Sequence, residues 1–296
     1  MPEAATTIAT RDHWVEHPRG RLFARIWTPL GSLSATHARS PIVLFHDSLG
    51  CVELWRSFPA ALCAATGRRV IAYDRLGFGR SSPRTDRLHP SFIPEEAETT
   101  LPLLGAQLDF ARFIALGHSV GGGMAVHCAA RHPTRCEALI TIAAQAFVED
   151  RTRQGIIEAR ELFRQPGQFE RLQRYHGDKT RWVLEAWIET WLAPEFADWA
   201  LRETLPKVAC PTLVIHGSED EYGSTVHPKL IAELTSGPSR LEIMLGVRHV
   251  PHREQESRVV ACVADFRAAH YTWARPPSAG FSRCLAAPRA HGPESD

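Results

Sequence analysis

One serine of this chain stands in a context that could make its hydroxyl a nucleophile. Residues 117–121, Gly-His-Ser-Val-Gly, fit the G-x-S-x-G pattern, which places a serine at a sharp turn between a strand and a helix. An apolar stretch at 113–116 and a helix-forming stretch at 124–130 flank the pattern as this turn requires. We therefore interpret Ser119 as a catalytic nucleophile. The alternative is a glycine-rich turn in which Ser119 only caps a helix.

A nucleophilic serine needs a base, and the base needs a carboxylate that orients it. Asp220 is the best candidate for the carboxylate, because it follows the late apolar strand 210–217 by three residues. Glu219 and Glu221 are alternatives that we expect to be solvated, and Asp150 is a more distant one.

Several histidines compete for the role of base. His249 lies in a loop just before the last helix, where it could lean across the sheet edge toward Ser119. His252 falls in the first turn of that helix, where we expect it to be capping or exposed. His249 and His252 could also form a metal pair, but no third ligand is evident, so no metal is predicted. His118 is expected to point away from the hydroxyl, and His46 to pack under the loop that it begins. His249 is therefore the predicted base.

The loop after the apolar strand 41–45 could supply an oxyanion hole. A turn that follows a central strand is where an α/β sheet makes its ligand contacts. We expect the backbone amide of Ser48, in this loop, and that of Val120 to bind a developing oxyanion. The alternative is an ordinary strand-to-helix turn.

Composition excludes several classes of function. The 296 residues carry a formal net charge of +1, which gives no sign of a nucleic-acid or membrane partner. The seven scattered cysteines form no CxxC pair and favour free, mostly buried thiols in a reducing compartment. The N-terminus does not resemble a signal peptide, and no apolar run is long enough to cross a bilayer. We expect a cytoplasmic protein whose partner is a small-molecule substrate.

Strands alternate with helices along the first half, with helices expected at 53–66 and 94–109, which predicts a parallel, doubly wound sheet. The pattern changes to helices at 145–205, a stretch that carries four of the eight tryptophans. We predict a core at 12–144 and 206–272, a helical cap at 145–205, and disordered termini at 1–11 and 273–296. Trp182 and Trp187 of the cap are candidates to line an apolar acyl pocket. They could equally hold the cap together.

At this point the chain resembles the α/β-hydrolase superfamily. The order Ser119, Asp220, His249 is the order of that superfamily. The resemblance spans 12–271 and rests on the His46 loop, the Asp74-Arg-x-Gly-x-Gly-x-Ser loop, and the motifs around the three residues. It implies an α/β fold with a mostly parallel eight-stranded sheet, helices on both faces and a helical cap. One departure is Asp47, where the superfamily usually has glycine. Its carboxylate could weaken an oxyanion hole, or point away or bind the cap.

Within the superfamily the chain looks similar to capped esterases, thioesterases and carbon–carbon hydrolases. The resemblance implies acyl transfer to water with no cofactor. We expect hydrolysis of an ester or thioester with a small to medium apolar acyl group. Two other reactions would use the same three catalytic residues. One is carbon–carbon hydrolysis of a keto acid whose carboxylate is held by Arg174 or Arg181, and the other is acyl transfer to an acceptor other than water. A protein that binds a ligand without turnover is a third alternative. The oligomeric state stays open.

Overall fold

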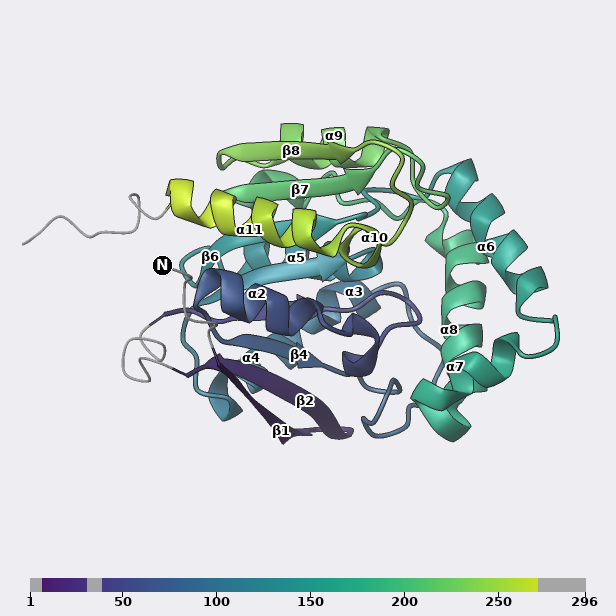
Figure 1. Cartoon of the computed structure of the whole chain (residues 1–296). Helices are drawn as coiled ribbons and strands as arrows, with labels where there is room; N and C mark the ends of the chain where they lie inside the picture. The colour runs from purple at the N-terminus through teal and green to yellow at the C-terminus, as the bar shows by residue number, and fades with distance from the viewer. Residues whose placement is uncertain (1–6, 31–38, 271–296) are drawn as a thin grey trace, which may run out of the picture.

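The computed structural model describes residues 7–30 and 39–270. Within them, one sheet has the strand order β1-β2-β4-β3-β5-β6-β7-β8. The pairs β1–β2 and β2–β4 are antiparallel, and the other neighbours are parallel. This is the predicted mostly parallel eight-stranded sheet (Figure 1). The strands are β1 (Ile8–His17), β2 (Gly20–Pro29), β3 (Ile42–Phe45), β4 (Val70–Tyr73), β5 (Phe113–His118), β6 (Cys136–Ile142), β7 (Thr212–Gly217) and β8 (Ser239–Met244).

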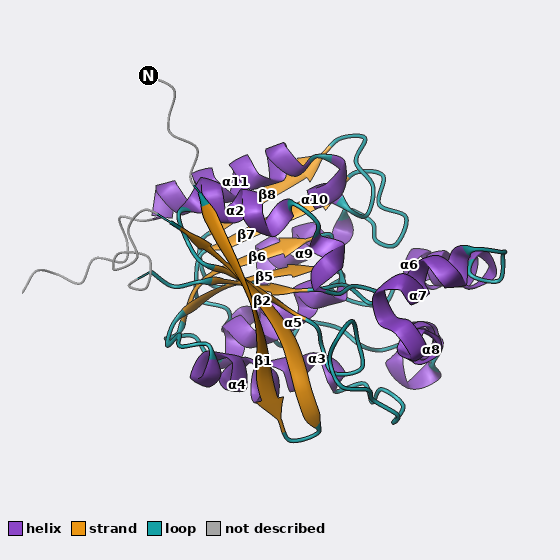
Figure 2. Ribbon diagram, turned by 60° about the horizontal axis from the view of Figure 1, so that its bottom comes forward, coloured by secondary structure: helices purple, strands orange, loops and turns teal. Residues whose placement is uncertain are grey.

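Helices cover both faces of the sheet, as predicted (Figure 2). One face is covered by α2 (Phe58–Thr66) and α11 (Glu256–His270), which contact each other. The opposite face is covered by α3 (Phe92–Glu95), α4 (Leu101–Gln107), α5 (Val120–Arg131) and α9 (Val226–Leu234). The remaining described helical segments are η1 (Val52–Trp55), η2 (Glu96–Thr100), α6 (Asp150–Leu162), α7 (Gln168–His176), η3 (Gly177–Lys179), α8 (Thr180–Leu192), η4 (Pro194–Phe196), η5 (Leu205–Lys207) and α10 (Pro251–Glu254).

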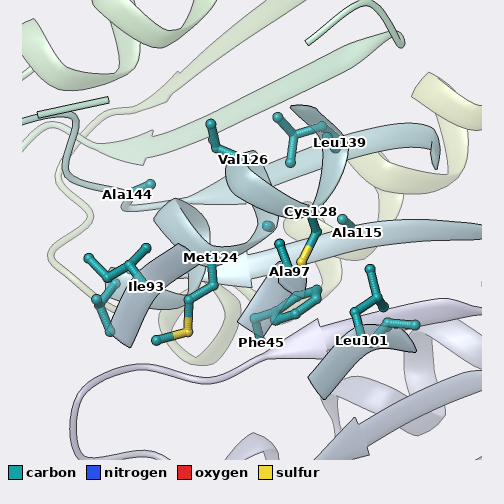
Figure 3. Close-up of a cluster of buried hydrophobic side chains, with 14 of the residues drawn as sticks. Phe45, Ile93, Ala97, Leu101, Ala115, Met124, Val126, Cys128, Leu139 and Ala144 are labelled. Atoms are coloured by element: carbon teal, nitrogen blue, oxygen red, sulfur yellow. The ribbon is translucent and has the colours of Figure 1, made fainter. Parts of the chain in front are cut away.

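The core consists of two apolar clusters, one on each face of the sheet. Successive side chains of a strand point to opposite faces. Val43 and Phe45 of β3 therefore join one cluster, while Ile42 and Leu44 join the other. Figure 3 shows the first cluster, in which Met124 of α5 lies near Phe45. Burial on both faces explains why these short strands are continuous apolar runs.

The stretch 145–205 stands apart from the helices that cover the sheet. Its helices α6, α7 and α8 lie beyond the carboxyl ends of the parallel strands (Figures 1 and 2). The two ends of the stretch are joined by a bridge between Phe147 and Ala200 and by a hydrogen bond from the Leu201 amide to the Ala146 carbonyl at 2.7 Å. Residues 145–205 therefore leave the sheet after β6 and return to it before β7, and the two ends of this stretch lie side by side. We call residues 145–205 the cap.

Some predicted boundaries were wrong. The strand β1 begins at Ile8, so residues 8–11, predicted to be disordered, pair with β2. The predicted helix 94–109 is divided by the π-type segment η2. Its next helix begins near Pro102, which has no amide hydrogen for an α-helical bond to the preceding turn. Residues 1–6 and the predicted tail 273–296 lie outside the described residues.

Two further observations concern predicted absences. The six cysteines in the described ranges are free and buried, as predicted, and Cys284 lies outside those ranges. Among the helices that the structure describes, none is long and apolar enough to cross a membrane.

Candidate active site

Ser119 occupies a strained turn between β5 and α5. Its backbone has φ 55° and ψ −127°, a conformation that non-glycine residues rarely adopt. The two flanking glycines are required by close backbone contacts: a Cβ on Gly117 would lie 2.0 Å from the Gly121 oxygen, and one on Gly121 would lie 2.1 Å from the Phe45 oxygen. The sequence pattern thus corresponds to a turn that no larger residues at 117 and 121 could form, and it presents Ser119 at the carboxyl end of β5.

The imidazole of His249 is held by Asp220. The His249 Nδ1–H faces both carboxylate oxygens, Oδ1 at 2.9 Å and Oδ2 at 2.8 Å. Asp220 is itself fixed, because its Oδ1 accepts hydrogen bonds from the amides of Tyr222 at 2.8 Å and Gly223 at 3.1 Å. Asp220 is fully buried and His249 is nearly so. With Nδ1 occupied in this way, Nε2 is the nitrogen of His249 that is free to act as a base.

The electrostatics of this pair favour a charged imidazole. Burial by itself lowers the pKa of His249, but the charge and hydrogen bond of Asp220 outweigh burial and raise it above the ordinary value. Burial in turn raises the pKa of Asp220, but the charge and hydrogen bond of His249 outweigh it and lower that pKa. Asp220 is therefore ionised and can stabilise an imidazolium at His249.

Ser119 and His249 line the same cavity but are not hydrogen-bonded to each other in the described part of the chain. The Ser119 hydroxyl instead donates to Oε1 of Gln145 at 3.4 Å. Gln145 follows β6 at the same edge of the sheet and is buried. For the hydroxyl to donate to His249, it must first leave Gln145. Such loose contacts are common when no substrate is present.

The two amides predicted to bind an oxyanion are available. Val120 is the first residue of α5, so its amide has no partner within the helix. Ser48 lies in the loop after β3 and lines the cavity beside Ser119. Among the described residues neither amide has a hydrogen-bond acceptor. The Ser48 amide can therefore donate to an oxygen in the cavity, and the Val120 amide lies directly after Ser119 at the start of α5.

The cavity beside Ser119 has a volume of about 150 Å³, and residues of the cap form part of its wall. Trp187 lines it. Trp182 does not, and this prediction was wrong: its ring packs on Phe78 at 5.5 Å and its indole N–H donates to the Asp86 carbonyl at 3.1 Å. The residues that line the cavity are Asp47, Ser48, Leu49, His118, Ser119, Gln145, Thr152, Ile156, Trp187, Trp191, Tyr222, His249 and Val250.

Comparison with known proteins identifies the family. A family model of the alpha/beta hydrolase fold matches residues 40–188, half of the chain. The chain belongs to the α/β-hydrolase fold family. The mouse protein named serine hydrolase BPHL is 29% identical over 215 residues, which cover 67% of this chain and 68% of the mouse protein.

Solved structures agree with this α/β-hydrolase fold. A bacterial membrane phospholipase A has a TM-score of 0.71 at 20% identity, covering 88% of this chain and 86% of that one. A 2-hydroxy-6-oxo-6-phenylhexa-2,4-dienoate hydrolase from Rhodococcus has a TM-score of 0.71 at 17% identity, covering 88% and 100%. At such identities the likeness concerns the fold alone.

The structure also places the competing residues of this α/β-hydrolase. Glu221 is partly exposed and accepts the His249 amide at 3.2 Å, so it supports the backbone of the base rather than its ring. Asp150 is exposed at the start of α6. The expectation that His252 is capping or exposed was wrong. Its side chain is buried, and the centre of its ring lies 4.9 Å from the centre of the Trp55 ring. No cluster of metal-ligating side chains occurs in the described ranges.

Sequence reasoning missed three features of the site. Trp191 lines the cavity together with Trp187, which lies one helical turn away on the same helix face. This four-residue spacing could have indicated that Trp187 and Trp191 share a face that Trp182 does not. Gln145 carries no local signal, since it meets Ser119 only through the fold. The Asp47 carboxylate neither points away nor binds the cap; it contacts His118.

Proposed function

We propose that this protein is a serine hydrolase that cleaves a carboxylic ester or thioester through an acyl-enzyme. The observation that carries the proposal is one cavity that contains both a strained Ser119 and a His249 held by a buried Asp220. A serine with an adjacent base, itself oriented by a third group, is the arrangement of nucleophilic catalysis. The named mouse relative, a serine hydrolase, is consistent with it.

In the proposed reaction His249 Nε2 takes the Ser119 proton as the oxygen attacks the substrate carbonyl. The amides of Ser48 and Val120 stabilise the oxyanion of the tetrahedral intermediate. The imidazolium then gives its proton to the leaving alcohol or thiol. Water, deprotonated by the same histidine, next attacks the acyl-enzyme and releases the acid. Asp220 fixes the tautomer throughout and needs no change of charge.

The cavity supports a small, uncharged acyl group. A volume of about 150 Å³ is large enough to hold a benzene ring. Its walls include Ile156, Trp187 and Trp191, and no lysine or arginine is among the described lining residues. Arg174 and Arg181 are exposed, and Arg181 pairs with Glu185 at 3.9 Å. The cation that would hold a keto-acid carboxylate is thus not found there, which favours an ester or thioester over a carbon–carbon substrate.

Hydrolysis of p-nitrophenyl esters of increasing acyl length tests this function. We expect turnover of short acyl groups up to the size of benzoyl, and its loss in Ser119→Ala. The exposed Ser91→Ala is the matched control and should keep wild-type rates. Full activity of Ser119→Ala would refute the proposal. No turnover of any ester by folded wild type would move the assignment to carbon–carbon cleavage or acyl transfer, and then to ligand binding without catalysis.

A further inference from the structure

Asp47 lies in the loop that carries the oxyanion donor Ser48, and its carboxylate has two partners. Oδ1 accepts the amide of Leu49 at 3.0 Å, which folds the loop around Ser48. Oδ2 faces the Nδ1 atom of His118 at 3.1 Å. Its side chain is about one quarter exposed, and it lines the cavity of the active site. One carboxylate therefore shapes the oxyanion loop and joins it to the residue that precedes Ser119.

His118 continues this connection to the loop of the catalytic base. Its ring is almost fully buried, and its Nε2 contacts the backbone carbonyl of His249 at 2.8 Å. A carboxylate and a carbonyl are both acceptors. The two hydrogen bonds can therefore exist together only when both ring nitrogens of His118 carry hydrogen, as in the imidazolium.

The surroundings favour a charged pair at this place. Burial raises the pKa of Asp47, but the hydrogen bond and charge of His118 outweigh burial and hold that pKa well below its usual range. The ring of His252, 4.6 Å from that of His118, is buried, and burial keeps its own pKa well below the ordinary value. His252 is therefore neutral and does not repel His118. A buried charge whose partner is removed is costly, so the pair resists separation.

We propose that Asp47 and His118 are positioning residues that bridge the oxyanion loop to the backbone of His249. The proposal rests on the proposed hydrolase function. The bridge fixes the separation between the donors at Ser48 and the base at His249, with Ser119 next to His118 in the chain. A displacement of about 1 Å in a catalytic group can cost on the order of 100-fold in rate. The bridge thus acts on catalysis without touching the substrate.

Kinetics of Asp47→Gly, His118→Gln and the double variant test the bridge. We expect kcat to fall about 10- to 100-fold in each single variant, while KM changes little, because alignment and not binding is lost. The double variant should be no slower than the slower single one, since one connection is broken in all three. Glu185→Gln, which breaks the exposed pair with Arg181, is the matched control and should leave both constants unchanged.

Long-range ¹H–¹⁵N spectra of protein labelled at histidine provide a second readout. Wild type should show hydrogen on both ring nitrogens of His118, as the two acceptor oxygens at Asp47 and His249 require, and Asp47→Gly should show it on only one. A His118 with one bare nitrogen in the folded wild type would overturn the bridge. So would kcat values within twofold of wild type in both single variants, or losses that add in the double variant.

Labelling by a fluorophosphonate separates failure of the bridge from failure of the proposed function. If folded wild type does not react at Ser119, the hydrolase function is refuted and the catalytic role of the bridge with it. If wild type and both single variants react equally fast, the bridge alone is refuted. We expect wild type to react, and the single variants to react about 10- to 100-fold more slowly.

Discussion

His249 is the residue whose charge decides the rate in the proposed mechanism, because only its neutral form accepts the Ser119 proton. Its pKa is raised by Asp220 despite burial. We therefore expect kcat/KM to increase with pH and to reach half of its plateau above about 6.5, the ordinary pKa of histidine. A pH–rate profile on a p-nitrophenyl ester measures this directly.

The same pH–rate profile measured on Asp220→Asn tests whether Asp220 raises the pKa of His249. Removal of the carboxylate leaves burial, which lowers the pKa of His249, so the half-plateau should move to lower pH. The plateau itself should fall by about 10⁴-fold, since the tautomer is no longer fixed. A half-plateau that stays in place in this variant would mean that Asp220 does not orient the base.

Single residues differ in how well the sequence predicts them. Ser119 could be predicted from the local pattern of glycines around it. Asp220 and His249 could be predicted from their positions directly after late strands. The contact of Asp47 with His118 spans 71 positions in the chain and that of His118 with His249 spans 131. No local pattern encodes such contacts, so these partners became visible only in the folded chain.

At the scale of elements, the turn between β5 and α5 depends on the absence of a side chain at Gly121. The Phe45 oxygen that a Cβ would meet at 2.1 Å belongs to a buried strand backbone and has no room to move. We expect Gly121→Ala to lower the free energy of unfolding by at least about 3 kcal/mol. Urea denaturation measures the difference.

Gly123→Ala is the matched control two residues further along α5. Its Cβ would meet Trp199 at 3.4 Å, an ordinary contact. Alanine also favours helix over glycine, so we expect stability to be unchanged or to rise by up to about 1 kcal/mol. Equal losses in the two variants would show that the close approach at 121 does not hold the turn.

The cap is attached to the core loop 74–82 by Lys179. Its ammonium donates to the carbonyls of Phe78 at 3.2 Å and Gly79 at 2.6 Å. Lys179→Met leaves the Gly79 carbonyl without this donor, while the Phe78 carbonyl keeps the Ser81 amide at 3.0 Å. It should lower the free energy of unfolding by about 2 kcal/mol. Lys229→Met, at an exposed position of α9, should change it little. Thermal unfolding of the two variants compares them, and an equal effect would contradict the attachment.

Helices and strands could be predicted where the spacing of apolar residues and the neighbouring turn residues indicated the same element. The apolar runs of the parallel strands and the helix after Ser119 are read from their patterns. The break of the predicted helix 53–66 is not, because it occurs at Arg56, a non-glycine residue with φ 54° that carries no turn signal. The division of 94–109 differs, because Pro102 at the start of α4 is a signal for it in the sequence.

At the scale of the whole molecule, the proposed reacting groups lie at the ends of sheet strands, and the cap contributes Trp187 and Trp191 to the wall of the cavity. Trp187→Ala removes a wall of that cavity, so the preferred acyl length should shift to longer chains. Trp182→Ala is a matched control, because Trp182 is also partly exposed on α8 but packs against Phe78 outside the cavity. An acyl series run on both variants checks this; an unchanged optimum in Trp187→Ala would contradict the role of the cap.

The central claim is that Ser119 is a nucleophile activated by His249. It is tested most directly by mass spectrometry after reaction with a fluorophosphonate. We predict one adduct on the peptide that contains Ser119 in wild type, none in Ser119→Ala, and formation slowed by about 1,000-fold or more in His249→Ala. A folded wild-type protein that stays unlabelled, or one labelled at another serine, would contradict the account.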